Sequence, residues 1–192
     1  MRVIACGTGM PTTRAAQAAA CFLVELGNGD KFFFDVGTGS MANVAAYMIP
    51  YDFLDKVFLT HLHTDHWGDL DALWAGGWTA GRTEALKVWG PSGARPDMGT
   101  RHALEHFAKT FNWDFATRAT RLSNVPGTIE IHEFDYLAEK TALERIVFGY
   151  MVDFVFLDAV IDSRELPTLR KRLLPQLRAA FPEAAFRSSV AE

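Results

Sequence analysis

The sequence has only two cysteines, Cys6 and Cys21, and both lie within apolar segments that are typical of strands. Two cysteines cannot build a disulfide framework, so we expect two buried free thiols. No run of 18 or more apolar residues occurs, so no membrane-spanning helix is expected. The formal net charge is -4. Charge therefore gives no support for nucleic acid as a partner, although it leaves one open.

Histidine is absent from a long part of the chain, because nothing after His132 is a histidine. The chain of 192 residues with 49% hydrophobic content is otherwise sufficient for one globular domain with a substantial core. Its first residues already resemble a strand and not a signal peptide, which predicts a cytoplasmic protein. An export signal missing from the N-terminus of this sequence is the alternative.

Four of the possible metal ligands are concentrated in one short stretch, which follows the apolar run Lys56 to Leu59: His61, His63, Asp65 and His66. Residues two apart in an extended segment share a face, so His61 and His63 can bind one metal ion. Asp65 and His66 follow a turn and are expected at a second position a few ångströms away. Imidazole nitrogens with one carboxylate favour Zn²⁺, as one or two ions, with Mn²⁺ or Fe²⁺ as alternatives.

This stretch resembles the His-x-His-x-Asp-His motif of the metallo-β-lactamase superfamily. Three further segments, 1–11, 32–39 and 88–93, resemble the ribonuclease Z and arylsulfatase-like branch of that superfamily. The resemblance covers about residues 1–136. It implies an α/β fold of the αββα sandwich type, whose second half would here be incomplete or atypical.

The same resemblance implies metal ligands that this sequence does not supply. Members of the superfamily add two histidines and a bridging aspartate from the second half of the fold. Here that half has no histidine, and only Asp158, after the apolar run 153–157, has the setting of a bridging aspartate. A plain strand end or a helix cap is the alternative for Asp158.

The chain up to residue 136 alternates apolar runs with turn signals. Strands are predicted over five ranges, with a hairpin turn at 28–30: 2–6, 20–26, 31–36, 56–60 and 85–89. Helices are predicted over 41–48, which Pro50 closes, and over 68–75, with His66 near the N-terminal end of the second. This order predicts helices packed on a sheet.

Two further aspartates are expected near the metal site without binding the metal directly. Asp35 ends an apolar strand, where a carboxylate needs a partner. It can orient a ligating histidine or cap the following turn. Asp69 has the same two alternatives, and its position in the first turn of the predicted helix favours capping.

Other candidates have a structural alternative. Trp74 and Trp78 can form a wall of the cleft or fill the core. His102 and His106 are four apart on a predicted helix, which can hold a metal but more often forms a solvated face. His132 lies on a predicted strand, and we expect it to be structural or to lie at the edge of the cleft.

Residues 137–192 differ in character from the rest and are predicted to form a divergent tail, with one strand and short amphipathic helices broken by proline. Either the native second half has been lost or the chain is a short, divergent form. If the tail does not cover the first sheet, a homodimer is expected.

Two functions follow from these observations. The first is a metal-dependent hydrolase of phosphodiester or sulfate ester bonds, in which Asp65 is the catalytic residue that orients the attacking water. Asp65 is expected in a solvent-facing turn and not in the core. The second is an impaired remnant of the fold, which binds a metal or a partner without turnover.

Overall fold

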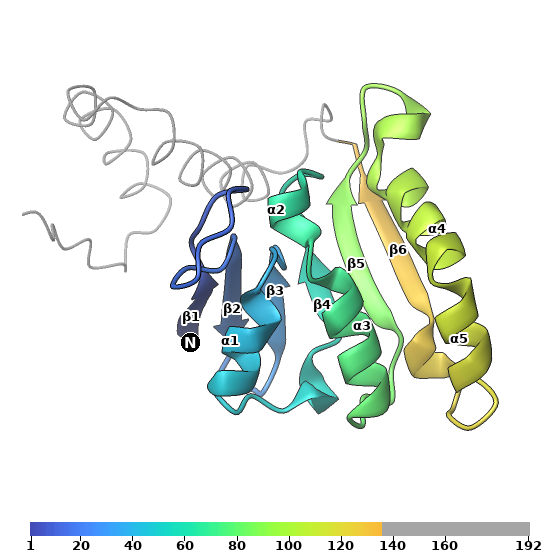
Figure 1. The fold of residues 1–192 in the computed structure, drawn as a ribbon, viewed down its shortest axis with the longest axis horizontal. Helices are drawn as coiled ribbons and strands as arrows, with labels where there is room; N and C mark the ends of the chain where they lie inside the picture. The colour runs from blue at the N-terminus through green and yellow to red at the C-terminus, as the bar shows by residue number, and fades with distance from the viewer. Residues whose placement is uncertain (136–192) are drawn as a thin grey trace, which may run out of the picture. The chain divides into compact units, whose positions relative to one another are not determined.

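A computed structural model describes residues 1–135 of the chain. These residues form a six-stranded sheet in the order β1-β2-β3-β4-β5-β6. The strands are β1 (Arg2–Gly7), β2 (Cys21–Glu25), β3 (Lys31–Phe34), β4 (Lys56–Phe58), β5 (Leu86–Pro91) and β6 (Ile129–Phe134). Strands β1 to β3 are antiparallel, and β3 to β6 are parallel. Figure 1 shows these strands side by side in this order.

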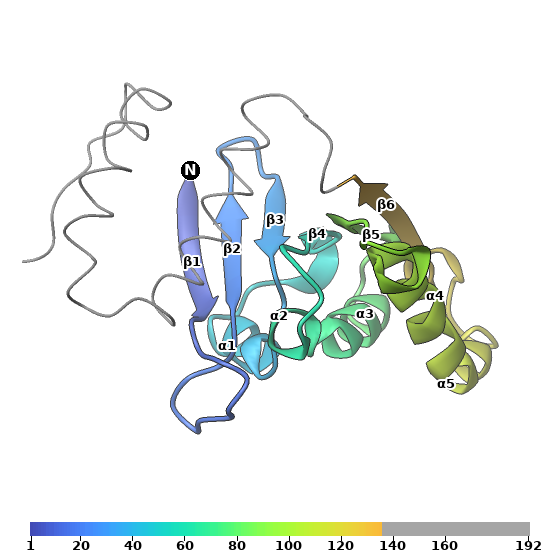
Figure 2. The ribbon, with the colours of Figure 1, turned by 90° about the horizontal axis from the view of Figure 1, so that it is seen from above.

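Helices connect the parallel strands and lie on one face of the sheet (Figure 2). They are α1 (Ser40–Ala46), α2 (Thr64–Trp67), α3 (Leu70–Thr79), α4 (Thr100–Thr110) and α5 (Asn112–Arg118), with short 3-10 turns η1 (Tyr51–Phe53), η2 (Pro96–Met98) and η3 (Val125–Gly127). The predicted α/β class and the five predicted strands are confirmed. Among the helices of residues 1–135, none has the length and apolar character needed to cross a bilayer.

The core lies between the sheet and the helices because alternate strand residues face the helices. Leu23, Phe33, Val57 and Val88 are fully buried, one from each of four neighbouring strands. Burial of each such side chain contributes about 1.5–3 kcal/mol. Cys6 and Cys21 are buried free thiols in the same cluster, as predicted. This packing fixes the strand ends from which the candidate site is built.

Trp74 and Trp78 belong to this core, so their use as a cleft wall is not what the structure shows. Trp74 is 3% exposed, and its indole donates to the carbonyl of Gly127. Trp78 is 4% exposed, and its indole donates to the carbonyl of Ser123. The two side chains therefore hold η3 and the residues just before it against α3.

Arg82 is a fully buried cation whose importance the sequence did not reveal. Its guanidinium donates to backbone carbonyls of the residue after η1, of α3 and of η3, which include those of Leu54, Trp74 and Pro126. Burial lowers the pKa of Arg82 to about 10. A Cβ on Gly77 would lie 2.1 Å from the guanidinium, so a glycine is needed at that turn of α3. Arg82 therefore links three segments at the end of α3.

Two predicted helix boundaries differ in the structure. His66 is not in the helix of 68–75 but in the separate α2, and α3 begins only at Leu70. Asp69 was expected to cap its own helix, yet its carboxylate makes no such bond. It accepts hydrogen bonds from the backbone N–H groups of Gly39 and Met41 at the start of α1. The reason is that α1 has no acidic residue in its first turn and a glycine as its N-cap.

Candidate functional site

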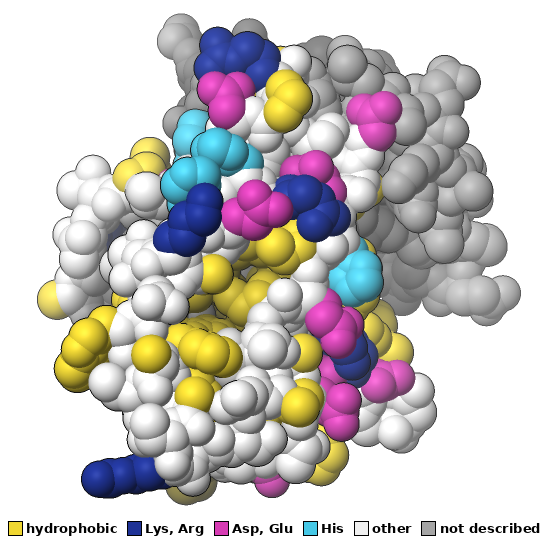
Figure 3. All heavy atoms as spheres, turned by 90° about the vertical axis from the view of Figure 1, so that its right-hand side faces the viewer, with side chains coloured by type: hydrophobic (Ala, Val, Ile, Leu, Met, Phe, Trp, Pro, Cys, Tyr) yellow, Lys and Arg dark blue, Asp and Glu magenta, His cyan; other side chains and the backbone are white. Residues whose placement is uncertain are grey.

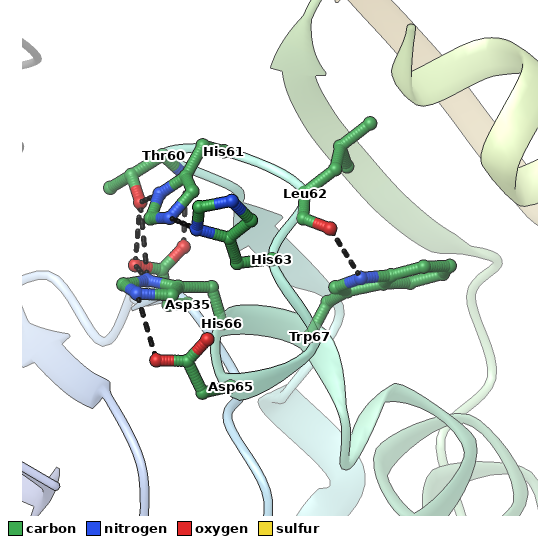
Figure 4. Close-up of polar contacts among 8 residues, drawn as sticks. All are labelled: Asp35, Thr60, His61, Leu62, His63, Asp65, His66 and Trp67. Atoms are coloured by element: carbon green, nitrogen blue, oxygen red, sulfur yellow. Dashed lines mark hydrogen bonds and ion pairs between the residues drawn. The ribbon is translucent and has the colours of Figure 1, made fainter. Parts of the chain in front are cut away.

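The candidate site lies where the carboxyl ends of β3 and β4 meet. These strands are parallel neighbours, so the residues that follow them lie at the same edge of the sheet. Asp35 follows β3 directly, and Thr60 to His66 follow β4. Figure 4 shows the polar side chains of this region gathered together, whereas that of Leu62 points away: Asp35, Thr60, His61, His63, Asp65 and His66. Residues far apart in the sequence are thereby brought to one place.

The segment after β3 is held against the histidine motif by backbone hydrogen bonds. The N–H of Val36 donates to the carbonyl of His66, and the carbonyl of Val36 accepts from the N–H of Asp69. Gly37 fits closely against the motif, since a Cβ there would lie 2.0 Å from the carbonyl oxygen of Asp65. Gly39 has φ 84, which only glycine adopts without cost. The two glycines thus serve the turn itself.

Asp35 is buried and holds the histidine motif in place. One carboxylate oxygen accepts from the N–H of Thr60 at 2.8 Å. The other accepts from the Thr60 hydroxyl at 2.8 Å and from His66 Nδ1 at 2.7 Å. These are the contacts that orientation of a ligating histidine requires. Asp69 does not take part in this arrangement, because its carboxylate binds the backbone at the start of α1.

These hydrogen bonds determine which nitrogen of His66 carries the proton. Because the Asp35 carboxylate only accepts, Nδ1 of His66 is the donor and Nε2 carries the lone pair. His66 Nε2 lies 3.5 Å from a carboxylate oxygen of Asp65. The other oxygen of Asp65 is buried and has no hydrogen-bond partner. A cation placed between His66 Nε2 and Asp65 would pair with both groups.

His61 and His63 form a second pair of candidate metal ligands. Nε2 of His61 lies 3.0 Å from Nδ1 of His63, and Nδ1 of His61 lies 3.1 Å from the Thr60 hydroxyl. Two nitrogens on one tetrahedral zinc, each about 2.0–2.1 Å from it, would lie about 3.3 Å apart. The observed spacing is close to that value. Burial, followed by the nearby His66, lowers the pKa of His61 to about 4, so its ring is neutral near pH 7.

The donor set therefore fits a divalent metal ion in type and in spacing, as two pairs of ligands. Within residues 1–135, however, no three His, Cys, Asp or Glu side chains are placed to hold one ion. The described part brings together two candidate ligands at each position. Asp158, the predicted fifth ligand, and the predicted tail of 137–192 lie outside the described residues.

The prediction that Asp65 occupies a solvent-facing turn is wrong. Asp65 is 8% exposed. The reason is that residues 35–37 pack over the start of α2, with Gly37 directly against the backbone of Asp65. Thr60 is the residue that the sequence did not point to. Its position immediately before the motif was the one available signal.

The remaining histidines lie away from this site. His102 and His106 are neighbours on α4, with ring centroids 4.2 Å apart. His106 Nδ1 donates to the carbonyl of His102. No further ligand within residues 1–135 joins them. His132 stacks on Trp89 with centroids 4.7 Å apart, which agrees with a structural use.

Comparison with known proteins finds similarity to ribonucleases. The family model of the anti-Pycsar protein Apyc1 matches residues 1–88. Ribonuclease Z of Mycobacterium marinum is 32% identical over 133 residues, which cover 67% of this chain and 45% of that protein. Ribonuclease Z of Parabacteroides distasonis is 24% identical over an alignment of 205 residues, gaps included, which covers 96% of this chain and 66% of that protein.

The described part of the chain shares its fold with a solved structure of a tRNase Z. Human tRNase Z, short form, has a TM-score of 0.54 at 18% identity, over 74% of this chain and 49% of that one. The metallo-β-lactamase fold protein YhfI of Bacillus subtilis has a TM-score of 0.49 at 20% identity, over 73% and 49%. The chain spans less than half the length of the Mycobacterium relative. The relatives named here are not arylsulfatases, and that side of the resemblance stays a prediction.

Proposed function

Since the described part of this chain has the metallo-β-lactamase fold and is ribonuclease Z-like, we propose that the chain is a metal-dependent phosphodiester hydrolase. The observation that carries this proposal is the pair of facing acceptors at Asp65 and His66. One carboxylate oxygen of Asp65 lies 3.5 Å from Nε2 of His66, and its other oxygen is buried without a hydrogen-bond partner in residues 1–135, which is costly unless a cation or a polar ligand joins it. Zn²⁺ suits this donor set best, with Mn²⁺ and Fe²⁺ next.

In this proposal His61 and His63 hold one ion, and Asp65 and His66 contribute to a second. When bound, such ions supply Lewis-acid stabilisation of the charge that develops on the phosphoryl oxygens. Asp65 accepts a hydrogen bond from the attacking water through its otherwise unpartnered oxygen and so orients it. Asp35 keeps Nε2 of His66 available for binding by accepting a hydrogen bond from Nδ1–H. Water and a phosphodiester give a phosphomonoester and an alcohol.

RNA is the phosphodiester that the named relatives suggest, since they are ribonucleases. Sulfate esters are a second substrate class, from the arylsulfatase side of the resemblance. A small-molecule phosphodiester fits the same chemistry. The cytoplasmic location and the division into 1–136 and 137–192 stay proposals, as does the homodimer, which sedimentation velocity at micromolar concentration would detect.

A second candidate function is a metal-binding or partner-binding protein without turnover. It is favoured by one observation: residues 1–135 bring only two ligands to each position. An ion with few protein ligands lowers the pKa of water less than a complete site does. Any hydrolysis is then weak, increases above neutral pH and is stimulated by added Zn²⁺ or Mn²⁺.

The test is hydrolysis of bis(p-nitrophenyl) phosphate and of p-nitrophenyl sulfate across pH and metal concentration. Asp65→Asn is the informative variant, because Asp65 is buried and an amide of equal size preserves the packing. Asp71→Asn, in the exposed first turn of α3, is the matched control. The proposal expects activity in wild type and control and its loss in Asp65→Asn. Absence of hydrolysis at every metal concentration tested would favour the second function.

A further inference from the structure

An exposed tryptophan stands beside a hollow at the end of α5. Trp113 is 77% exposed, whereas Trp74 and Trp78 are buried. The hollow has a volume of about 650 Å³. Its lining is mixed aromatic, hydroxyl and cationic: Trp113, Asp114, Thr117, Arg118, Arg121 and Leu122 among others. Trp113 is not used by the core.

The cations at this hollow differ in how they are paired. Arg118 is held by Asp114, with Nε 2.8 Å from the carboxylate. Arg121 has no acidic side chain of residues 1–135 within ion-pair distance. Figure 3 shows basic and acidic side chains lying together over the upper part of this side of the molecule.

Aromatic and guanidinium groups together suit one class of ligand. An exposed indole face stacks on a nucleic acid base, whatever the base. A guanidinium without a carboxylate partner binds a phosphate through two parallel hydrogen bonds. The hydroxyls of Thr117 and Thr120 already donate to backbone carbonyls, so the donors for a phosphate are those of the arginines. A volume of several hundred Å³ is that of a small-molecule site.

We propose that the hollow beside Trp113 docks an unpaired nucleotide of an RNA strand, with the base on Trp113 and the phosphate at Arg121. This rests on the proposed function only in taking RNA as the ligand. The end of α5 lies at the opposite end of the sheet from α2 (Figure 1). The docking site is therefore separate from the histidine motif, and contributes binding of the strand and not chemistry.

The test is the affinity for a short, fluorescein-labelled single-stranded RNA, measured by anisotropy at fixed salt. Loss of one stacked base corresponds to about tenfold weaker binding, which is expected for Trp113→Ala. Trp113→Phe retains an aromatic face and should stay within about threefold of wild type. Arg121→Glu should weaken binding more than Arg14→Glu, the same charge change at an exposed arginine outside the hollow.

Several results would overturn the proposal. These are no binding of the RNA by the wild type, unchanged affinity in Trp113→Ala, or equal losses in Arg121→Glu and Arg14→Glu. If Trp113→Ala instead shifts self-association in sedimentation, the hollow contacts protein and not RNA. Circular dichroism confirms that each variant is folded. Hydrolysis of bis(p-nitrophenyl) phosphate by the wild type, measured in parallel, shows separately whether the proposed function holds.

Discussion

Replacement of Asp35 by asparagine should loosen the histidine motif without removing any proposed ligand. The two carboxylate oxygens of Asp35 accept three hydrogen bonds, from the N–H and hydroxyl of Thr60 and from His66. An amide has only one accepting oxygen. If that oxygen keeps the contacts with His66 and the hydroxyl, its NH₂ group faces the buried N–H of Thr60.

The magnitude follows from that one lost acceptor. A buried donor left without a partner costs about 1–3 kcal/mol. For a chain of this size that corresponds to a melting temperature lower by about 2–12 °C. Asp35 has φ 59, a conformation that asparagine tolerates well, so backbone strain adds little. Loss of an outer partner of a ligating histidine typically weakens metal binding about 10–100-fold.

The assay combines urea unfolding followed by circular dichroism with competition for Zn²⁺ against a chromophoric chelator. Asp71→Asn, a surface change of the same kind, should alter stability by less than about 0.5 kcal/mol. Unchanged stability together with unchanged zinc affinity in Asp35→Asn would refute the assigned role of Asp35. Lower stability with unchanged zinc affinity would reduce that role to folding alone.

Three further predictions concern residues around the site. Arg82→Leu should lower the free energy of unfolding by about 3–5 kcal/mol in urea titration, because the carbonyls of three segments lose their donors; a loss below about 1 kcal/mol would contradict this. Gly37→Ala should lower the free energy of unfolding by about 1–3 kcal/mol, since its Cβ would overlap the carbonyl oxygen of Asp65. A stability equal to wild type would contradict this close fit of the 35–37 segment. The pKa of His61 is lowered to about 4 in the folded chain, so between pH 6.5 and about 4 the unfolded chain binds a proton that the folded chain does not. The free energy of unfolding of the chelator-treated protein should therefore decrease as the pH is lowered through that range. His61→Gln should reduce this dependence of stability on pH. A pH profile equal to that of wild type would contradict the role given to His61.

Much of the fold follows from local patterns in the sequence. The five predicted strands and the first helix depend on alternation and on turn residues, which are local. The position of His61 and His63 on one face also follows from an extended segment. The grouping of Asp35 with the motif was open, because it depends on β3 and β4 being parallel neighbours. A carboxylate at the end of an apolar strand indicated only that a partner was needed.

The parts that could not be predicted depend on contacts between distant segments. The carboxylate of Asp69 binds the start of α1 and not its own helix, and local propensity carries no sign of that. Asp65 is buried because the 35–37 segment covers it. Arg82 appeared as an ordinary charged residue, although five backbone carbonyls surround its guanidinium. Each of these depends on tertiary packing.

The most direct test of the central claim is the zinc content of purified protein by mass spectrometry after dialysis in a metal buffer. The double variant His61→Ala and His63→Ala should lose most of the bound zinc, because each position has few ligands to lose. The double variant His102→Ala and His106→Ala removes two histidines from one helix and should keep the zinc content of wild type. Stoichiometric zinc in the first variant, or its loss in the second, would contradict a metal site at the histidine motif.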